Sequence, residues 1–372
     1  MRRYAPCLTG TADTTIVPPR STVERPAREQ CLGPAGATTQ RSEAADVRAL
    51  DVLTGLLRDD LAAVDSIIHQ RMESSVGLIP NLAAYLIDAG GKRVRPMITL
   101  AAARLLSDQV PDAARKLAAA VEFIHTATLL HDDVVDESAL RRGRTSANFV
   151  WGNSASVLVG DFLFARAFNL MVDAGDLNVL GVLANASSII AEGEVMQLAA
   201  INDADATLER YLQIIEAKTA ALFAAAARVG AMAAGATPAA ADQLSAYGRN
   251  VGLAFQLVDD ALDYGGRAAA MGKNVGDDFR EGKVTMPVAL ARESGDAEER
   301  AFWRRVMGGD AQGEGDFDRA VAILRRRGAI TRTLDAAAAY AESAKAALAA
   351  FAPSPIKTAL IDLADFIVER GA

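Results

Sequence analysis

Apolar residues recur at intervals of three and four positions along nearly the whole chain from about residue 46 onward. The segment 46-DVRALDVLTGLLRDDLAAVDSIIHQRM-72 shows this period, and it is rich in Ala, Leu and Arg, which favour helices. No stretch alternates apolar and polar residues convincingly in the manner of a strand. The sequence therefore predicts an all-α fold with helices of about 15 to 25 residues. Glycine and proline are expected to punctuate these helices at Pro80, Gly90, Gly91, Pro96, Gly152, Gly230, Gly235, Pro238, Gly265, Gly266, Pro287, Gly308, Gly309 and Pro353.

Some of the expected helices are apolar around most of their circumference, for example 177-LNVLGVLANASSIIAEGEVMQLAA-200. Such helices are typical of the interior of a large bundle. With 372 residues, 51% of them hydrophobic, the chain can fill a substantial core. No uninterrupted apolar run reaches the ~18 residues of a membrane-spanning helix. We therefore expect one helical domain over residues 45–372 that does not span a membrane.

Residues 1–44 differ from the rest of the chain. They hold five prolines and show no hydrophobic period, so we expect either a disordered tail or an extension that comes from a translation start placed too far upstream. The opening MRRYAPCLTG lacks the apolar centre of a secretory signal. Both cysteines, Cys7 and Cys31, fall in this segment, so neither a disulfide nor a thiolate metal site is expected and the cytoplasm is the simplest location.

Two aspartate clusters with the same D-D-x-x-D spacing stand in apolar sequence. The first, Asp132, Asp133 and Asp136, follows 117-LAAAVEFIHTATLL-130, and the second, Asp259, Asp260 and Asp263, lies in 255-FQLVDDALDY-264. On a helix, residues four apart share a face. One such cluster could equally be a solvated acidic turn, but two of identical spacing argue for a shared role. Because carboxylates are costly to bury without a positive partner, we expect cations to meet them.

The residues around these clusters suggest what those cations are. Magnesium takes oxygen ligands, typically one or two carboxylates together with substrate phosphates, whereas zinc would need cysteines or more histidines than the chain offers. The net charge of -8 argues against general nucleic-acid binding. Each basic motif alone is typical of a helix end. Together they supply more positive charge than one diphosphate needs, which indicates two diphosphate substrates; the motifs are 90-GGKRVRP-96, 141-RRGRTS-146, 218-KT-219, 272-GKN-274 and 282-GK-283.

Seven ordered motifs between about residues 50 and 370 resemble those of the trans-isoprenyl diphosphate synthases, and most closely the long-chain polyprenyl members that make octaprenyl to decaprenyl products. The resemblance implies an all-α bundle of the isoprenoid synthase type around a deep central cavity, a homodimer, and isopentenyl diphosphate and an allylic diphosphate as substrates. The motifs are GGKRVRP, HTATLLHDDVVDESALRRG, WGNSASVLVGDFLFARAF, AEGEVMQL, KTAALF, FQLVDDALDY and GKNVGDDFREGKVTMPVAL.

The resemblance also implies roles for single residues. Asp132, Asp136 and Asp259 would hold Mg²⁺ on the allylic diphosphate, with Asp133, Asp260 and Asp263 supporting them. Residues expected around the allylic diphosphate are Arg141, Lys218, Thr219, Gln256, Lys273 and Lys283, of which Lys218 and Lys273 count with the three aspartates as catalytic. Residues expected around the diphosphate of isopentenyl diphosphate are Lys92, Arg95, His125 and Arg142.

The small residues Ala127 and Thr128 precede the first cluster by about one helical turn, at a level that bulky aromatic residues close in short-chain members. They are therefore expected to let a long product pass. The resemblance favours a prenyltransferase that makes a long all-trans polyprenyl diphosphate, for a quinone side chain, with at most peripheral membrane contact for product release. The alternatives are a medium-chain, geranylgeranyl-type synthase and a noncatalytic subunit of a heteromeric synthase. A class I terpene cyclase fits less well, because such cyclases usually carry N-D-x-x-S-x-x-x-E where this chain has DDALD.

Overall fold

The computed structural model describes residues 49–370 except 89–90, 142, 266–274 and 310–311. The expected tail and the expected ligands Arg142 and Lys273 lie outside the described residues. Residues 49–56 are helical. The elements that follow are α2 Arg58–Met72, α3 Leu78–Asp88, α4 Val94–Arg104, α5 Asp112–Val135, β1 Leu140–Arg141, β2 Arg144–Thr145, α6 Ala147–Trp151, α7 Asn153–Asp173, α8 Leu177–Ala200, α9 Leu208–Ile215, the π-helix η1 Glu216–Ala220, α10 Ala221–Ala233, α11 Pro238–Tyr264, α12 Asp277–Arg280, α13 Met286–Ser294, α14 Ala297–Val306, α15 Asp316–Arg326, α16 Ala329–Ala347 and α17 Pro355–Glu369.

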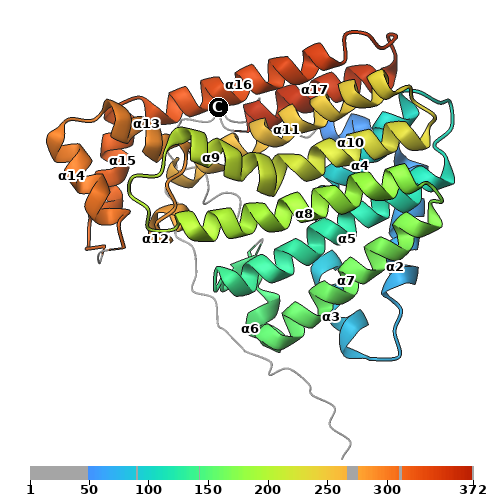
Figure 1. Cartoon of the computed structure of the whole chain (residues 1–372), viewed down its shortest axis with the longest axis horizontal. Coiled ribbons are helices and arrows are strands. Elements are labelled where there is room, and N and C mark those ends of the chain that lie inside the picture. Colours follow the sequence, from blue (N-terminus) through green and yellow to red (C-terminus); the bar gives the residue numbers. More distant parts are fainter. Residues whose placement is uncertain (1–48, 89–90, 142, 266–274, 310–311, 371–372) are drawn as a thin grey trace, which may run out of the picture.

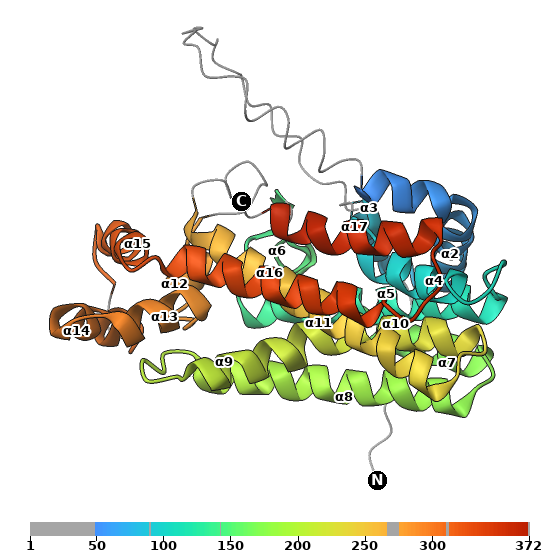
Figure 2. The ribbon, with the colours of Figure 1, turned by 90° about the horizontal axis from the view of Figure 1, so that it is seen from above.

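The long helices form a bundle in which α5 packs along α7, α10 lies between α4 and α11, and α11 runs along α16 (Figure 1). The all-α prediction is confirmed, and the two-residue antiparallel strands β1 and β2 are a small addition that the sequence pattern did not show. Side chains of α2, α4, α5, α7, α10 and α17 fill the larger hydrophobic cluster. A second cluster joins α11 to α13, α14 and α15, which extend from one end of the bundle (Figure 2).

Several of the expected breaks are helix starts. Pro238 is the first residue of α11, and the Thr237 hydroxyl accepts a hydrogen bond from the backbone N–H of Ala240, so a cap and a proline begin this helix together. Pro96 and Pro287 lie in the first turns of α4 and α13, where a missing N–H costs no helical hydrogen bond. The prolines therefore mark the beginnings of helices rather than gaps between them.

The expected break at Gly230 is wrong, because α10 continues through it. A Cβ atom on Gly230 would lie 2.0 Å from the carbonyl oxygen of Thr99 on α4. The glycine is needed because the backbones of α4 and α10 approach each other closely, and a helix can tolerate an interior glycine when packing requires it.

The expectation that 177–200 lies inside the bundle is also wrong. Helix α8 buries one side only, and Leu177 and Val195 are 83% and 67% exposed. Helix α7 likewise leaves Leu158 67% exposed. The two helices contact each other, and both leave large apolar side chains exposed. By length and composition alone, α7 and α8 could each cross a membrane, with mean hydropathies of 1.5 and 1.3. Polar residues interrupt both apolar stretches, so a search for uninterrupted apolar runs does not find them.

The close contact at Gly230 gives a test of the packing. Gly230→Ala should lower the free energy of unfolding by about 2 to 4 kcal/mol, because the new methyl group forces α4 and α10 apart. Gly55→Ala is the matched control, since nothing lies within 4 Å of its added Cβ atom. This control should raise stability by about 0.5 to 1 kcal/mol through helix propensity alone. Urea unfolding followed by circular dichroism measures both, and equal effects would contradict the packing argument.

Candidate active site

The first aspartate cluster lies at the end of α5, where Asp132 is in the last turn and Asp136 caps the helix. One carboxylate oxygen of Asp132 lies 3.6 Å from the Lys218 ammonium, and one of Asp136 lies 3.4 Å from that of Lys283. The Lys218 ammonium also donates a hydrogen bond of 2.6 Å to Glu194 on α8. Segments far apart in the sequence therefore meet around these carboxylates.

Lys218 and Thr219 lie in the π-helix η1, which joins α9 to α10. A single π-helical turn is uncommon and often marks a functional site, because the extra residue in the turn redirects side chains. Helix α8 lies directly against this turn, and a Cβ atom on Gly193 would be only 2.8 Å from the backbone nitrogen of Lys218. The glycine thus allows Glu194, the next residue, to reach the Lys218 ammonium.

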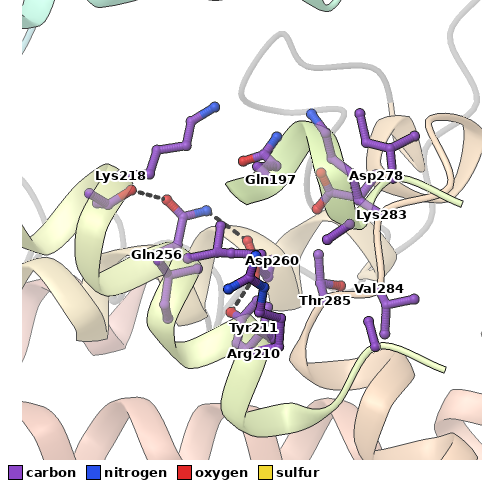
Figure 3. Close-up of a pocket in the computed structure, with 16 residues that line it drawn as sticks. Gln197, Arg210, Tyr211, Lys218, Gln256, Asp260, Asp278, Lys283, Val284 and Thr285 are labelled. Atoms are coloured by element: carbon purple, nitrogen blue, oxygen red, sulfur yellow. Dashed lines mark hydrogen bonds between the residues drawn. The ribbon is translucent and has the colours of Figure 1, made fainter. Parts of the chain in front are cut away.

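The second aspartate cluster belongs to α11. Asp260 is buried, and its two oxygens accept hydrogen bonds from the Gln256 amide at 2.8 Å and the Tyr211 hydroxyl at 2.5 Å. The Thr219 hydroxyl donates to the Gln256 carbonyl oxygen at 2.8 Å, so a chain of hydrogen bonds links η1 to α9 through Asp260 (Figure 3). Asp259, by contrast, is paired with Arg370 at 2.8 Å.

Two further aspartates are held by structural partners. Asp133 is 1% exposed at its side chain and accepts two hydrogen bonds from the Arg141 guanidinium, at 2.8 and 2.5 Å. The carboxylate of Asp263 accepts three backbone N–H bonds of 3.1 to 3.2 Å at the start of α12, from Gly276, Asp277 and Asp278. These contacts fix the β1–β2 turn and α12 next to the site.

The six aspartates therefore divide into two groups. Asp132, Asp136 and Asp259 keep 14%, 17% and 23% of their side chains exposed, and each is paired with a lysine or arginine from a distant segment. Asp260 and Asp263 have both carboxylate oxygens occupied by neighbouring donors, and Asp133 is buried with its Oδ1 atom bound by Arg141. The first group is partly exposed and paired with basic side chains, and we call it the open aspartates.

Burial, with a smaller effect of neighbouring carboxylates, raises the pKa of several acids in the site. Burial, reinforced by the nearby Asp132, raises the pKa of Glu194 to about 7 despite the Lys218 ammonium. Burial also raises the pKa of Asp260 to about 7 and shifts those of Asp132 and Asp263 upward. Burial disfavours the charged form of these carboxyl groups, so a cation bound beside them would stabilise that form.

A cavity of about 400 Å³ adjoins the second cluster, and we call it the basic cavity. The Arg95 guanidinium lies over the Phe223 ring at 4.3 Å and 3.1 Å from the Nε2 atom of His125. Arg93 is engaged by Glu122 at 2.5 Å. The cavity is thus lined by more positive than negative groups; the lining residues are Gly91, Lys92, Arg93, Val94, Arg95, Glu122, His125, Phe223, Phe255 and Arg370.

A smaller cavity of about 150 Å³ lies between α9, η1 and the segment that follows α12 (Figure 3). Its polar wall brings together residues that the sequence placed around the allylic diphosphate, namely Lys218, Thr219, Gln256 and Lys283, and it adds Tyr211 and Asp278. Burial raises the pKa of Asp278 well above its usual value. Four of the expected ligands therefore share one wall in the folded chain.

The two residues expected to control chain length lie on α5 before the first cluster. Ala127 is fully buried in the core, whereas Thr128 is half-buried and its hydroxyl donates to the carbonyl oxygen of His125 at 2.8 Å. Thr128 lies on the same face as Asp132, one turn earlier. Both side chains are small, as the sequence pattern required.

Four residues of the site were not predicted as functional: Glu194, Tyr211, Asp278 and Arg370. Glu194 had a signal, since a glutamate on the apolar helix 177–200 needs a partner. Tyr211 and Arg370 had none, because their aspartate partners lie 49 and 111 residues away along the chain. Only the folded chain brings them to the aspartates.

Comparison with known proteins assigns the chain to a family. Residues 76–324 match the polyprenyl synthetase family. The chain is 45% identical over 323 residues to the octaprenyl diphosphate synthase of Escherichia coli, which covers 86% of this chain and 99% of that protein. A polyprenyl synthase of Caulobacter crescentus, solved with calcium and isoprenyl diphosphate, is 55% identical with a TM-score of 0.83, over 87% of this chain and 98% of that one.

A decaprenyl diphosphate synthase of Rhodobacter capsulatus is 52% identical, also with a TM-score of 0.83, over 87% of this chain and 99% of that one. These relatives share the isoprenoid synthase fold, and two of them are named as synthases of long products, octaprenyl and decaprenyl diphosphate. The chain therefore belongs to the polyprenyl synthetase family, as a long-chain trans-polyprenyl diphosphate synthase.

Proposed function

We propose that the chain extends an allylic diphosphate with successive isopentenyl diphosphates in a Mg²⁺-dependent reaction, and that the open aspartates and the basic cavity are its two substrate-binding regions. The observation that carries the proposal is the pairing of each open aspartate with a cationic side chain from a distant segment. A Mg²⁺–diphosphate complex supplies both signs of charge, so it can satisfy the aspartates and the lysines together.

The donor set fits magnesium. The open aspartates offer only oxygen atoms, and burial raises the pKa of Asp132 and of the nearby Glu194, so a bound cation would stabilise their ionised forms. In the part of the chain that the structure describes, no three His, Cys, Asp or Glu side chains are grouped to hold a metal ion unaided. A cation that relies on phosphate oxygens and water for its remaining ligands suits such a site. When bound, Mg²⁺ would neutralise the charge that develops on the departing diphosphate.

The side chains have separate tasks in this reaction. Lys218, Thr219, Gln256 and Lys283 hold the allylic diphosphate, to which we add Arg141 and Lys273 from the sequence pattern. Lys92, Arg95 and His125 hold the diphosphate of isopentenyl diphosphate in the basic cavity, together with Arg142. Two separate anion sites keep the two substrates apart and orient their carbon ends toward each other, which lowers the entropic cost of the bimolecular step.

The reaction itself needs no nucleophilic side chain. The allylic C–O bond breaks and its electron pair leaves with the diphosphate, which Lys218 and Lys283 help to stabilise. The double bond of isopentenyl diphosphate then attacks the allylic cation and forms a C–C bond. Loss of one proton, which we assign to the released diphosphate, creates the new trans double bond and leaves a diphosphate ester five carbons longer.

The exposed apolar face of α7 and α8 supports a homodimer. Its largest exposed side chains are Val157, Leu158, Phe168, Val172, Leu177, Val195 and Leu198. Several large exposed apolar side chains on two neighbouring helices are typical of an interaction site, and we assign this one to a second copy. We place the enzyme in the cytoplasm, with membrane contact only for product release, and propose a quinone side chain as the fate of its long product.

The open aspartates give a first test. Asp132→Ala and Asp259→Ala should each leave a folded protein but lower Mg²⁺-dependent turnover by at least ~10²-fold, because each removes charge needed as diphosphate departs. Asp108→Ala, at an exposed position, is the control and should keep normal turnover. Incorporation of radiolabelled isopentenyl diphosphate onto farnesyl diphosphate measures the effect. Near-normal rates in either mutant would contradict the assignment.

The acidity of Glu194 gives a second test. Because its pKa is raised to about 7 in the folded state, the folded protein holds a proton that the unfolded chain releases near pH 4.5. Protonated Glu194 therefore favours the folded state at low pH, and this contribution to the free energy of unfolding is lost as the pH rises through 7. In metal-free buffer, the free energy of unfolding should fall between pH 5 and 8 in the unsubstituted protein. In Glu194→Gln this fall should be smaller by roughly 1 to 3 kcal/mol.

Urea unfolding at several pH values measures the difference, and Glu192→Gln, an exposed neighbour on the same helix, is the control. Parallel profiles for the Glu194→Gln and unsubstituted proteins would show that the Glu194 carboxyl does not titrate in this window.

Product length gives a third test. Ala127→Phe should shift the products to about fifteen or twenty carbons, because a ring at this fully buried position overfills the space beyond the first cluster. Ala127→Ser keeps the size of the side chain and should keep the long product. Chromatography of the dephosphorylated products gives their lengths, and thermal melting checks that the ring is accommodated. Full-length products from Ala127→Phe would place the path of the growing chain along another face.

A further inference from the structure

Arg292 on α13 holds the stretch of chain that joins α8 to α9, residues 201–207, which we call the connecting segment. The Arg292 guanidinium donates hydrogen bonds to the carbonyl oxygens of Ala204 and Ala206. The segment contains no helix or strand, so its carbonyls need donors from elsewhere in the chain. Hydrogen bonds from a charged donor are stronger than those from a neutral one. Arg292 therefore ties the connecting segment to α13, although Arg292 and Ala204 are 88 residues apart in the sequence.

The connecting segment in turn contacts the turn that precedes Lys283. The backbone N–H of Asn202 donates a hydrogen bond of 3.3 Å to the carbonyl oxygen of Gly282. The two residues are closely packed, because a Cβ atom on Gly282 would lie only 2.4 Å from the side-chain oxygen of Asn202. Gly282 also has a φ of 67°, which a residue with a side chain rarely adopts. This contact leaves the Gly282 turn little freedom to shift relative to the connecting segment.

The position of Lys283 depends on this turn, because it is the next residue after Gly282. Its ammonium lies 3.4 Å from a carboxylate oxygen of Asp136 and 2.5 Å from one of Glu281. Its side chain is 15% exposed, so packing limits the positions that the ammonium can take. Lys283 lines the small cavity, as do Ile201 and Ala206 of the connecting segment (Figure 3). The segment held by Arg292 is therefore part of the wall around Lys283.

We propose that Arg292 is a positioning residue for the allylic diphosphate: it fixes the connecting segment, which holds the Gly282 turn and so keeps the Lys283 ammonium beside Asp136. The proposal rests on the proposed function, which assigns Lys283 to the allylic diphosphate. Arg292 is not among the described residues that line either cavity, so its effect on binding passes through the residues that it holds. Such effects can be large, since misplacing a binding group by about 1 Å can cost ~10²-fold in rate.

The two substrates should respond differently to the loss of Arg292. The described residues that line the basic cavity belong to 91–95, α5, α10, α11 and Arg370, and none of them comes from α13 or the connecting segment. Removing Arg292 should therefore weaken the binding of the allylic diphosphate and spare that of isopentenyl diphosphate. A role in stability alone predicts no such difference, because partial unfolding would weaken the binding of both substrates.

Titration calorimetry on the full chain with Mg²⁺ measures both affinities. The first ligand is farnesyl thiodiphosphate, in which sulfur replaces the bridging oxygen and slows ionisation. Isopentenyl diphosphate is then titrated into protein saturated with the thiodiphosphate. Arg292→Met should weaken thiodiphosphate binding by at least ~5-fold and change isopentenyl diphosphate binding by less than ~2-fold. Arg300→Met is the matched control and should keep both affinities, because Arg300 likewise donates to a backbone carbonyl, that of Gly295, at the end of α13.

A double-mutant cycle tests whether the effect of Arg292 passes through Lys283. Lys283→Ala alone should weaken thiodiphosphate binding, because it removes a ligand of the diphosphate. In the Lys283→Ala background, Arg292→Met should cause a further loss of less than ~2-fold, because no ammonium is left to misplace.

Gly282→Ala tests the contact between the turn and the connecting segment, because its added methyl group would collide with Asn202. It should weaken thiodiphosphate binding as Arg292→Met does. Gly328→Ala is the matched control, since Gly328 has a similar φ of 60° but nothing lies within 4 Å of its added Cβ atom. Both substitutions strain the backbone, and only Gly282→Ala should lose affinity.

Thermal melting identifies any variant that fails to fold. If Arg292→Met is one of them, Arg292→Lys takes its place and should show a smaller loss confined to the thiodiphosphate, because an ammonium keeps the charge but not the planar set of donors. Unchanged thiodiphosphate binding in the folded Arg292 variant, an equal loss in the Lys283→Ala background, or equal affinities of Gly282→Ala and Gly328→Ala would overturn the inference and leave the proposed function intact. Failure of the unsubstituted and Arg300→Met proteins to bind farnesyl thiodiphosphate with Mg²⁺ would overturn the proposed function, and the inference with it.

Discussion

Carboxylates in an apolar bundle must be neutralised, and this constraint organises the site. Asp132, Asp136 and Asp259 lie near the ends of long helices whose other faces are packed, and burial raises the pKa of several acids around them. Each of the three is met by one lysine or arginine. Removing water from a charge is costly, so the fold must bring these basic groups to the aspartates before any ligand arrives.

This requirement explains local features that are otherwise unusual. The π-helical turn at Glu216–Ala220 presents Lys218 toward Asp132 and Thr219 toward the hydrogen-bond chain of Asp260. The three aspartates that are not open serve the architecture. Asp133 fixes the β1–β2 turn through Arg141, and Asp263 caps α12, the short helix that precedes Lys283. A single sequence pattern, D-D-x-x-D, thus combines open and structural carboxylates in each cluster.

The rest of the bundle supports this site through close backbone packing. Glycines at positions 193 and 230 let helices approach so closely that a methyl group would collide with a neighbouring backbone. Side-chain contacts then hold the helices at fixed distances, because a densely packed interior resists small displacements. The outer face of α7 and α8 keeps several large apolar side chains exposed. We connect that face with self-association, which would add rigidity behind the helix that carries Glu194.

The sequence by itself determined the all-α fold, the two aspartate clusters and many of the basic side chains that gather around them, because helical periodicity and short motifs are local properties of the chain. It failed at Gly230 and at residues 177–200, since neither a close helix–helix contact nor an exposed apolar face can be read from composition. The tertiary structure alone decided which aspartates stay open and which basic side chain meets each of them. Arg370 reaches Asp259 across 111 residues of chain, and only the packing of α17 against α4 and α11 brings the two together.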